Sequence, residues 1–339
     1  MKGCQEFDFL VELKKIMAKL RIYDRIQIFL MLKIMLFFDT TKDETMKLLF
    51  NHTFLDHNIG STYEGSYRLK EFSDLESTEA FGERYLKLVH TQEYIDQIKN
   101  FCETGSAVAE VELSPTSYKA ACLAVGLTVN ASESNNFAVV RPPGHHAHHD
   151  KASGFCLFNN VAIAAEKLAR EGKKVFILDI DGHHGDGTQH IFYDRKDVFY
   201  CSIHQQNTYP YTGTFMEIGK GEGLGYTLNI PIPENSGEKE FLKAAFKAIE
   251  TGVKFEPDVV AISAGFDGYR KDRLLELRLS LHAYYECGYR LSKAFKNVFG
   301  VLEGGYHEDL RECVNMFVEG INIGAKPSNI KWNHELSIG

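Results

Sequence analysis

Short apolar runs recur along the chain and are separated by longer amphipathic segments. Each run is rich in β-branched or aromatic residues and is bounded by polar or glycine-containing turns, which is the pattern of buried strands. The predicted strands are residues 34–38, 136–140, 174–178, 198–203, 258–263 and 298–302. Helical patterns fill the intervals, and Gly172 and Gly252 are candidate carboxyl-terminal caps of two of these helices.

This alternation predicts a mostly parallel β-sheet with helices on both faces, in a single α/β domain. We expect the domain over residues 33–325, followed by a tail over 326–339. Residues 1–32 form an amphipathic extension, for which a docked helix is the favoured interpretation, with an oligomer contact or a membrane-surface helix as alternatives. Its apolar stretch is too short to span a bilayer, so no transmembrane segment is expected.

Charge and cysteine content narrow the class of protein. The formal net charge of −8 argues against a direct nucleic-acid binder driven by electrostatics. The seven cysteines are odd in number and never form a C-x-x-C pair, which is typical of a reduced, cytoplasmic protein. We therefore expect a cytoplasmic protein that acts on a protein, a peptide or a small molecule.

Histidine, aspartate and tyrosine follow one predicted strand after another. Ligands of open parallel sheets bind beyond the carboxyl ends of the strands. The segments at these ends are R-P-P-G-H-H-A from residue 141, D-I-D-G-H-H-G-D-G from residue 179, His204, A-G-F-D to residue 267 and E-G-G-Y to residue 306. Chance placement of polar loops would not concentrate these groups at one edge, so this edge is the predicted functional site.

Three of these residues suit a divalent metal ion. Asp181 and His183 are two residues apart, so in an extended segment they point the same way. Asp267, at the end of another strand, could supply a third ligand. Two carboxylates and one imidazole make an open, catalytic-type site for Zn²⁺ or a similar ion such as Fe²⁺ or Co²⁺. Taken alone, Asp267 would be read as a loop residue or a helix cap.

Two adjacent histidines, His145 and His146, are candidates for proton transfer. A histidine with this role usually has a carboxylate that orients its other ring nitrogen, and Asp179 and Asp186 are the carboxylates available. Tyr306 follows two glycines and is suited to polarising a carbonyl oxygen. Three further histidines are expected to be structural or on the loop surface: His148, His149 and His184.

Five ordered motifs together carry a family resemblance: RPPGHHA, SGFCLFNNVAIA, LDIDGHHGDGTQ, SAGFD and LEGGY. They resemble the zinc-dependent histone deacetylase and acetylpolyamine amidohydrolase superfamily, in a class II-like, prokaryotic-type form. The resemblance covers roughly residues 33 to 325. It implies an arginase-like fold, one zinc ion per chain, a structural potassium ion, and hydrolysis of a linear amide bond by metal-activated water.

The resemblance also assigns residues to roles. It implies that Asp181, His183 and Asp267 bind zinc, that the His145–Asp179 and His146–Asp186 pairs handle protons with His146 as the base, and that Tyr306 holds the substrate carbonyl. The acyl-lysine tunnel would be lined by Gly154, Phe155 and Tyr209. Potassium would be bound by Asp179, Ser202, Ile203 and the backbone of Asp181 and His183, and a second monovalent ion would lie near Phe192, Arg195, Val198 and Tyr226.

Departures from the family pattern concern the mouth of the pocket. The H-P-E-x-P-x-R segment is replaced by HNIGSTYEGSYRL, and Tyr211 replaces a glycine of the P-G-T-G loop. Leu274 stands where polyamine-preferring relatives carry a glutamate, which favours N-acyl-lysine in a protein or peptide as the substrate. An acetylpolyamine or another small acylated amine is the alternative. Glu112 is a weaker candidate for an acid at the rim.

Two other classes of protein remain to be weighed. A binuclear manganese ureohydrolase would need a second set of ligands, which the sequence does not offer. A non-catalytic acyl-lysine reader would be expected to lose Tyr306 or a zinc ligand, and neither is lost.

Overall fold

A parallel β-sheet organises the part of the chain that the structure, a computed structural model, describes: residues 45–57, 60, 63–108 and 110–326. Within these residues the sheet has seven strands in the order β1-β4-β9-β8-β5-β6-β7, all pairs parallel. Its strands are β1 (Leu48–Leu49), β4 (Phe137–Ala138), β5 (Val175–Asp179), β6 (Val198–Gln205), β7 (Thr227–Ile232), β8 (Val259–Ala264) and β9 (Val298–Leu302). A separate antiparallel hairpin pairs β2 (Ala107–Val108) with β3 (Val111–Glu112).

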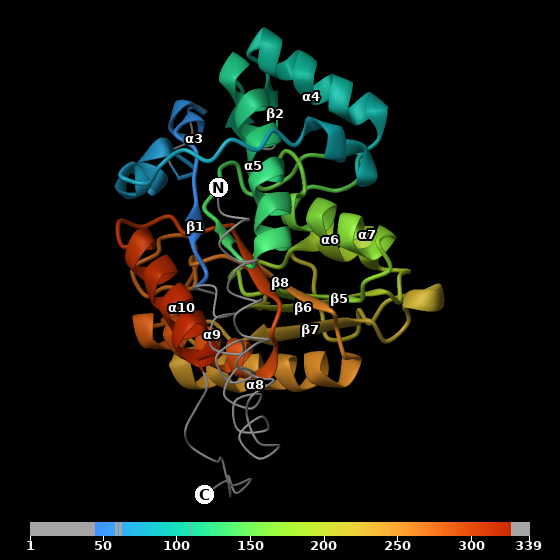
Figure 1. Ribbon diagram of the computed structural model, residues 1–339, viewed down its shortest axis with the longest axis vertical. Helices are drawn as coiled ribbons and strands as arrows, with labels where there is room; N and C mark the ends of the chain where they lie inside the picture. The colour runs from blue at the N-terminus through green and yellow to red at the C-terminus, as the bar shows by residue number, and fades with distance from the viewer. Residues whose placement is uncertain (1–44, 58–59, 61–62, 109, 327–339) are drawn as a thin grey trace, which may run out of the picture. The chain divides into compact units, whose positions relative to one another are not determined.

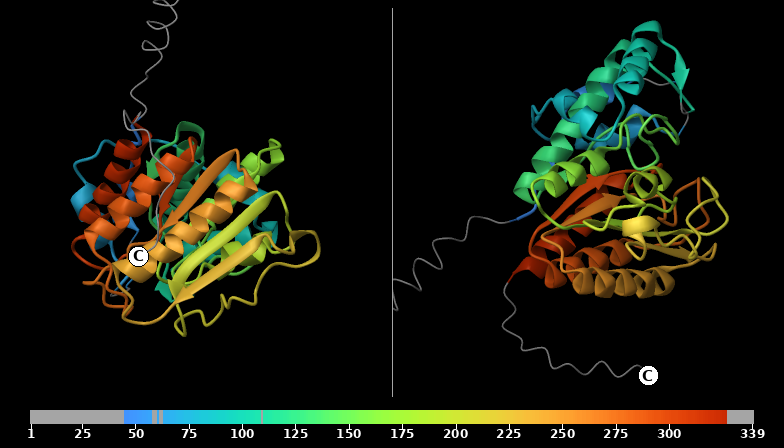
Figure 2. Two further views of the ribbon diagram at one scale, coloured as in Figure 1. Left: turned by 90° about the horizontal axis from the view of Figure 1, so that it is seen from below. Right: turned by 90° about the vertical axis from the view of Figure 1, so that its right-hand side faces the viewer.

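Helices cover both faces of this sheet, as the alternating pattern predicts (Figures 1 and 2). On one face lie α5 (Pro115–Ser134) and α6 (Asn160–Arg170); on the other lies α8 (Glu238–Phe255), with α9 (Leu281–Ala294) and α10 (Leu310–Ala325) packed beside it. The remaining helices are α3 (Thr53–Asp56), α4 (Gln92–Thr104), α7 (Asp186–Phe192), η1 (Ser66–Phe72), η2 (Glu83–Leu88) and η3 (Gly221–Gly223).

The central strands confirm the predictions from apolar runs. The structure has β5, β6, β8 and β9 within two residues of the predicted bounds, and every residue of these strands is buried. The predicted strand 136–140 shrinks to the two residues of β4. The sequence did not predict β7, because this edge strand mixes Thr, Asn and Pro with its apolar residues and is buried only in part.

Several sequence predictions fall outside the described residues. These are the whole extension 1–32, the strand 34–38 and the tail 326–339 beyond its first residue, so the proposed domain boundaries stay predictions. The compact unit that contains the sheet begins at Met46.

One predicted helix end is wrong. Gly252 does not cap α8, which continues to Phe255 and ends at Glu256, whose φ of 53° is left-handed. Gly252 is instead buried within the helix, where an added Cβ would lie 2.9 Å from Phe295 Cζ and 3.0 Å from Phe176 Cε1. The glycine permits close packing of α8 on aromatic rings. Gly172 follows α6 with a φ of +83°, in agreement with its predicted role.

The described cysteines are all buried and none forms a disulfide. Burial raises the pKa of each of their thiols, to about 12 for Cys102, Cys122 and Cys287. Among the described residues, no helix is long and apolar enough to cross a membrane.

A close contact between α5 and the segment before η2 depends on the absence of a side chain at Gly126. A Cβ there would lie 1.6 Å from the carbonyl oxygen of Ala80 and 2.8 Å from Gly82 N.

We expect Gly126→Ala to lower the free energy of unfolding by about 1–3 kcal/mol, although alanine is the better helix former. Urea denaturation measures this change. Lys119→Ala, on the exposed face of the same helix, should change stability by less than about 0.5 kcal/mol; equal effects of both substitutions would contradict the close-contact argument.

Candidate active site

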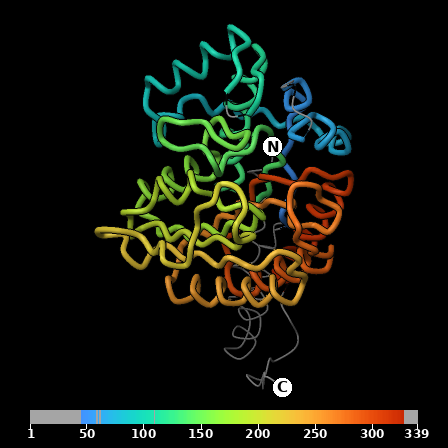
Figure 3. Tube along the Cα trace, turned by 180° about the vertical axis from the view of Figure 1, so that it is seen from behind, coloured from blue at the N-terminus to red at the C-terminus, as the bar shows by residue number. Residues whose placement is uncertain are grey.

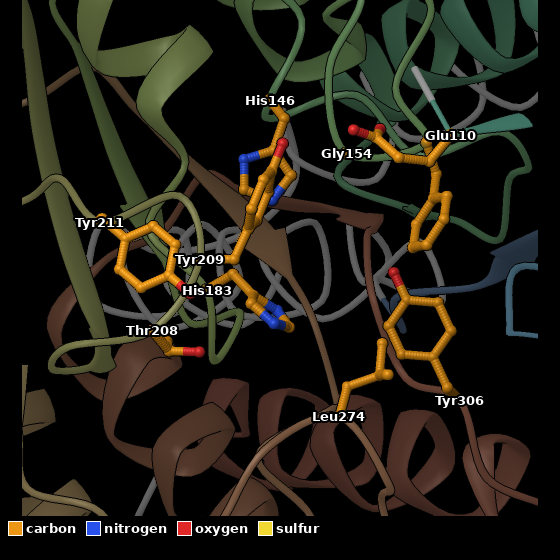
Figure 4. A pocket seen from close by; sticks show the side chains of 10 residues that line it. Glu110, His146, Gly154, His183, Thr208, Tyr209, Tyr211, Leu274 and Tyr306 are labelled. Carbon is orange, nitrogen blue, oxygen red and sulfur yellow. The ribbon is translucent and has the colours of Figure 1, made fainter. Parts of the chain in front are cut away.

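A pocket of about 320 Å³ opens at the carboxyl edge of the sheet, where the sequence predicts the site (Figure 4). Seven of the predicted site residues line it: His146, Gly154, Phe155, His183, Tyr209, Leu274 and Tyr306. Glu110, Thr208 and Tyr211 complete the lining. In Figure 4, Tyr209 and Tyr211 stand on one side of the pocket, and Tyr306 and Glu110 stand on the other.

Asp181, His183 and Asp267 converge in one buried cluster, with one ligand atom from each residue within 4.8 Å of the others. Nδ1 of His183 lies 2.6 Å from Asp267 Oδ2 and 3.3 Å from Asp181 Oδ1. The other oxygen of each carboxylate accepts a backbone N–H: Gly304 N donates to Asp181 Oδ2 at 2.7 Å, and Gly182 N donates to Asp267 Oδ1 at 2.7 Å. The backbone thus fixes the carboxylates and leaves one oxygen of each turned toward His183.

The charges in this cluster fit a divalent cation. Burial and the negative charge of Asp181 raise the pKa of Asp267 to about 7. Burial alone would lower the pKa of His183, but the two carboxylates outweigh it and raise this pKa to about 10. The cluster therefore holds a proton on His183 to balance its buried negative charge. A divalent ion would supply that charge in place of the proton, and carboxylate oxygens with imidazole nitrogen suit Zn²⁺.

Each of the tandem histidines has the carboxylate partner that the sequence predicts. His145 Nδ1 lies 3.0 Å from Asp179 Oδ2, and His146 Nδ1 lies 2.7 Å from Asp186 Oδ1. The two imidazole rings are 4.0 Å apart between centroids. Only His146 lines the pocket; His145 lies behind it, and its Nε2 is 3.8 Å from Asp181 Oδ1.

The two histidines differ in charge because their surroundings differ. Burial and the positive charge of His145 lower the pKa of His146 to about 4, against the opposing effect of Asp186. Burial alone would also lower the pKa of His145, but Asp181 and Asp179 raise it well above its usual value. The pKa values of the two histidines are thus shifted in opposite directions, and His146 is the one whose lowered pKa keeps its ring neutral and able to accept a proton.

A third histidine shares the carboxylate of Asp186, which corrects the prediction that His148 and His149 are loop surface. Both are half-buried, and His148 Nε2 lies 2.9 Å from Asp186 Oδ2. Asp186 therefore bridges two imidazoles, one through each oxygen. The ring of His149 is turned away, with its Nδ1 2.6 Å from the carbonyl oxygen of Val89. His184 is structural, as predicted, since its ring nitrogens contact Thr212 Oγ1 and Gln189 Oε1.

Tyr306 is held from behind by Arg68, which sequence reasoning did not single out. The Arg68 guanidinium lies 4.6 Å from the centre of the tyrosine ring, and Arg68 Nε donates to the carbonyl oxygen of Gly305 at 2.7 Å. Tyr306 N donates to Asp272 Oδ2 at 2.7 Å. These contacts fix both the backbone and the ring of Tyr306 at the pocket wall.

A buried glutamate links Arg68 to a second arginine. Glu64 Oε1 accepts from Arg68 at 3.0 Å and from Arg141 Nε at 2.7 Å. The segment that departs from H-P-E-x-P-x-R thus still provides a glutamate and an arginine four residues apart. That spacing was the signal in the sequence that could have identified Arg68.

Glu303 joins three segments under the pocket. Its Oε2 accepts from Gly144 N at 2.7 Å and from His145 N at 3.1 Å, and its Oε1 accepts from Ser263 Oγ at 2.7 Å. The side chain is fully buried, and burial raises its pKa to about 7. Glu303 therefore ties the loop after β4 and the end of β8 to its own position after β9.

The predicted tunnel residues form a narrow wall. Gly154 has a φ of +50°, and a Cβ there would lie 2.4 Å from His146 Cδ2. Tyr209 packs edge-on against His146 at 5.2 Å between ring centroids, and Phe155 against Tyr306 at 5.9 Å. The acid at the pocket is Glu110, at the turn of the β2–β3 hairpin, rather than the predicted Glu112.

The residues predicted for monovalent ions lie in two places. Asp179 and Ser202 are register partners on β5 and β6, with Ile203 next to them in the sheet. The second set, Phe192, Arg195, Val198 and Tyr226, lies near the opposite, amino edge, where β6 and β7 begin. Arg195 is already paired there with Asp197 and Glu166, at 2.7 and 2.9 Å.

Comparison with known proteins agrees with this geometry. The model of the histone deacetylase domain matches residues 56–321. A probable deacetylase of Archaeoglobus fulgidus is 38% identical over 258 residues, 72% of either chain. An acetylpolyamine amidohydrolase of Burkholderia pseudomallei is 41% identical over 202 residues, 58% of this chain and 59% of that protein.

The fold is shared as well. The crystal structure of the HD domain of HDA15 superposes with a TM-score of 0.76 at 31% identity, over 82% of this chain and 91% of that domain. The parallel sheet with helices on both faces is thus the arginase-like fold of these enzymes. The chain belongs to the histone deacetylase family and is a hydrolase that acts on amide bonds.

Proposed function

We propose that this protein is a zinc-dependent amidohydrolase that removes acetyl or other acyl groups from N-acyl-lysine in proteins or peptides. The observation that carries the proposal is the convergence of Asp181, His183 and Asp267 beside two histidine–aspartate pairs and Tyr306. When bound, zinc would polarise the amide carbonyl and lower the pKa of water from about 16 toward 7.

Proton transfer would fall to His146. Its Nδ1 is occupied by Asp186, so Nε2 is the atom that can take a proton from the attacking water and return it to the departing amine. Its neutral state at neutral pH supports this assignment. His145, oriented by Asp179 and with its pKa raised by the carboxylates of Asp181 and Asp179, would favour the charged form next to the reacting group.

The Tyr306 hydroxyl would donate a hydrogen bond to the oxygen of the scissile carbonyl. Burial raises the pKa of Tyr306 well above its usual value, so the hydroxyl stays protonated and remains a donor. The cation–π contact with Arg68 and the hydrogen bond to Asp272 hold it in place before substrate arrives. Such preorganised donors stabilise the charge that develops on the oxygen.

The pocket wall supports acyl-lysine as the substrate. Phe155, Tyr209 and Leu274 offer apolar contact to the alkyl chain of lysine, and Leu274 provides no charge for a distant ammonium group. An acetylpolyamine or another small acylated amine is the second candidate. The carboxylate of Glu110 in the lining favours it, and one relative is named an acetylpolyamine amidohydrolase.

We further propose a structural potassium ion bound by Asp179, Ser202, Ile203 and the backbone of Asp181 and His183. The pairing of Asp179 with Ser202 in adjacent strands supports it. A second monovalent site near Phe192, Arg195, Val198 and Tyr226 stays a weaker proposal, since Arg195 is already neutralised by two carboxylates.

Turnover of two substrates tests the proposed function. The zinc-loaded protein is assayed with an acetyl-lysine peptide and with acetylspermidine, each with and without a hydroxamate inhibitor. We expect hydroxamate-sensitive cleavage with the peptide preferred, because Leu274 cannot bind a second ammonium group. Preference for acetylspermidine would instead support a small acylated amine as the substrate, with Glu110 as the acid that favours it. Absence of cleavage of both substrates would exclude acetyl as the acyl group, and peptides with longer acyl groups would then be assayed; silence on these as well would contradict the proposal.

Removal of the Tyr306 hydroxyl tests the carbonyl-binding role. We expect Tyr306→Phe to lower kcat by about 100- to 1000-fold, the usual effect of losing one oxyanion donor. Zinc content per chain, measured by mass spectrometry, should stay at that of the unaltered protein, because Tyr306 is not one of the three metal-binding candidates. Near-normal turnover by the variant would show that the assignment is wrong.

The bridge from His148 to Asp186 generates a further prediction. His148→Leu removes one hydrogen-bond partner of the carboxylate that orients His146, and we expect about a tenfold lower kcat with little change in KM. His148→Gln keeps a donor N–H and should retain most of the activity. His190→Leu is the matched control, since the His190 ring lies 4.9 Å from that of His148 at a tilt of 47°, and Asp186 pairs with His146 and His148. Equal kcat for the Leu and Gln variants of residue 148 would rule out the hydrogen bond as the cause.

A further inference from the structure

The three most exposed large apolar side chains among the described residues lie in one loop next to the pocket. They are Tyr211 (79% exposed), Met216 (72%) and Phe215 (70%), in the loop between β6 and β7. This loop projects from the edge of the sheet (Figures 1 and 3). Tyr211 also lines the pocket, and Phe215 and Met216 follow it four and five residues later in the same loop. We call these three residues the apolar rim.

The backbone at Tyr211 is unfavourable for the residue that it carries. Its φ is +63°, in the left-handed region that favours glycine. Packing of the Tyr211 side chain offsets little of this backbone strain, because most of the side chain is exposed. A residue that strains the backbone without contributing to the core points to a contact with a partner outside the folded chain.

The loop is anchored and does not need to fold when a partner arrives. Tyr211 N donates to the carbonyl oxygen of Thr208 at 2.7 Å, and Thr212 Oγ1 lies 2.7 Å from His184 Nδ1. Glu217 accepts from Thr214 N at 2.8 Å and from Gln189 Nε2 at 2.6 Å. Glu217, next to Met216 in the chain, is thus engaged with the loop backbone and with α7, and the apolar side chains of the rim stay exposed. Such preorganisation reduces the entropic cost of binding.

We propose that the apolar rim binds apolar side chains next to the acyl-lysine of a peptide or protein substrate. This inference rests on the proposed function and specifies the class of substrate. The occupant follows from the place of Tyr211 in the pocket lining: the residues next to an acyl-lysine that enters past Tyr211 would lie against the loop that carries the apolar rim. A small acylated amine has no such residues and would leave Phe215 and Met216 without contact.

Substrates that differ only in flanking residues test the proposal. The zinc-loaded full chain is assayed with acetyl-lysine peptides that carry Leu or Ser on either side, and with Nε-acetyl-lysine blocked at both ends. We expect kcat/KM to be at least fivefold higher for the Leu peptide than for the Ser peptide. In the variant with Phe215→Ser and Met216→Ser this ratio should fall to about one, while turnover of the blocked amino acid stays within twofold of the unaltered protein.

Leu224→Ser is the matched control. Leu224 lies in the same loop and is 60% exposed, but it precedes β7 at the amino edge of the sheet, away from the pocket. This control should keep the full preference for the Leu peptide. If the unaltered protein turns over the blocked amino acid but shows no preference between the peptides, the inference is overturned and the proposed function stands. Failure to turn over any of the three substrates would overturn both.

The Tyr211→Gly variant tests the role of Tyr211 in peptide recognition separately from its effect on the stability of the protein. Glycine relieves the left-handed backbone, so the melting temperature should rise by a few degrees. The preference for the Leu peptide should fall at the same time, because the aromatic contact is lost. A rise in the melting temperature with an unchanged preference would overturn the role of Tyr211.

A second copy of this chain is the competing occupant. Sedimentation of the unaltered protein and of the Phe215→Ser, Met216→Ser variant distinguishes it. The proposal requires the same oligomeric state for both. A dimer that the variant converts to a monomer would assign the apolar rim to self-association and overturn the proposal.

Discussion

Two carboxylates buried side by side set the main electrostatic constraint of this structure. Asp181 and Asp267 are removed from water at the ends of adjacent strands, where uncompensated negative charge is strongly unfavourable. The N–H groups of Gly304 and Gly182 donate hydrogen bonds to the two carboxylates and so offset part of the negative charge. The carboxylates also raise the pKa of His183, whose proton offsets more of it. A centre with so strong a requirement for positive charge is well suited to retain a divalent ion.

The surrounding residues follow from this constraint. Asp181 and Asp179 raise the pKa of His145, whereas burial and the neighbouring His145 lower that of His146. Two adjacent, chemically identical side chains thus differ because one lies nearer the buried carboxylates and the other lacks such compensation for its burial. Tyr306 belongs to the same arrangement, since burial keeps its hydroxyl protonated while Arg68 and Asp272 fix its position.

The sequence predicted which residues gather at the strand ends and along the pocket wall, and it missed residues that support them or reach the pocket from other segments, for physical reasons. Asp181, His183, Asp267 and Tyr306 each follow a continuous apolar strand, so their meeting place depends only on parallel strands ending at a common edge. Arg68 could not be placed this way, because its partners at residues 303 and 305 are more than 230 positions away. His148 was misplaced since its ring partner, Asp186, lies on a separate element. Glu110 reaches the pocket from a hairpin that the pattern of apolar runs did not reveal.

Glu303 indicates how a site of this kind can change over evolutionary time. One carboxylate carries hydrogen bonds from the loop after β4, the end of β8 and its own segment, so a shift in any of these disturbs the others. The inner edge is therefore constrained as a unit and resists gradual drift. The loop between β6 and β7 is tied to the site through Thr212 and Gly213, whereas the side chains of Tyr211, Phe215 and Met216 are largely exposed. New substrate preferences can therefore arise by substitution at these exposed positions while the hydrolytic chemistry is inherited unchanged.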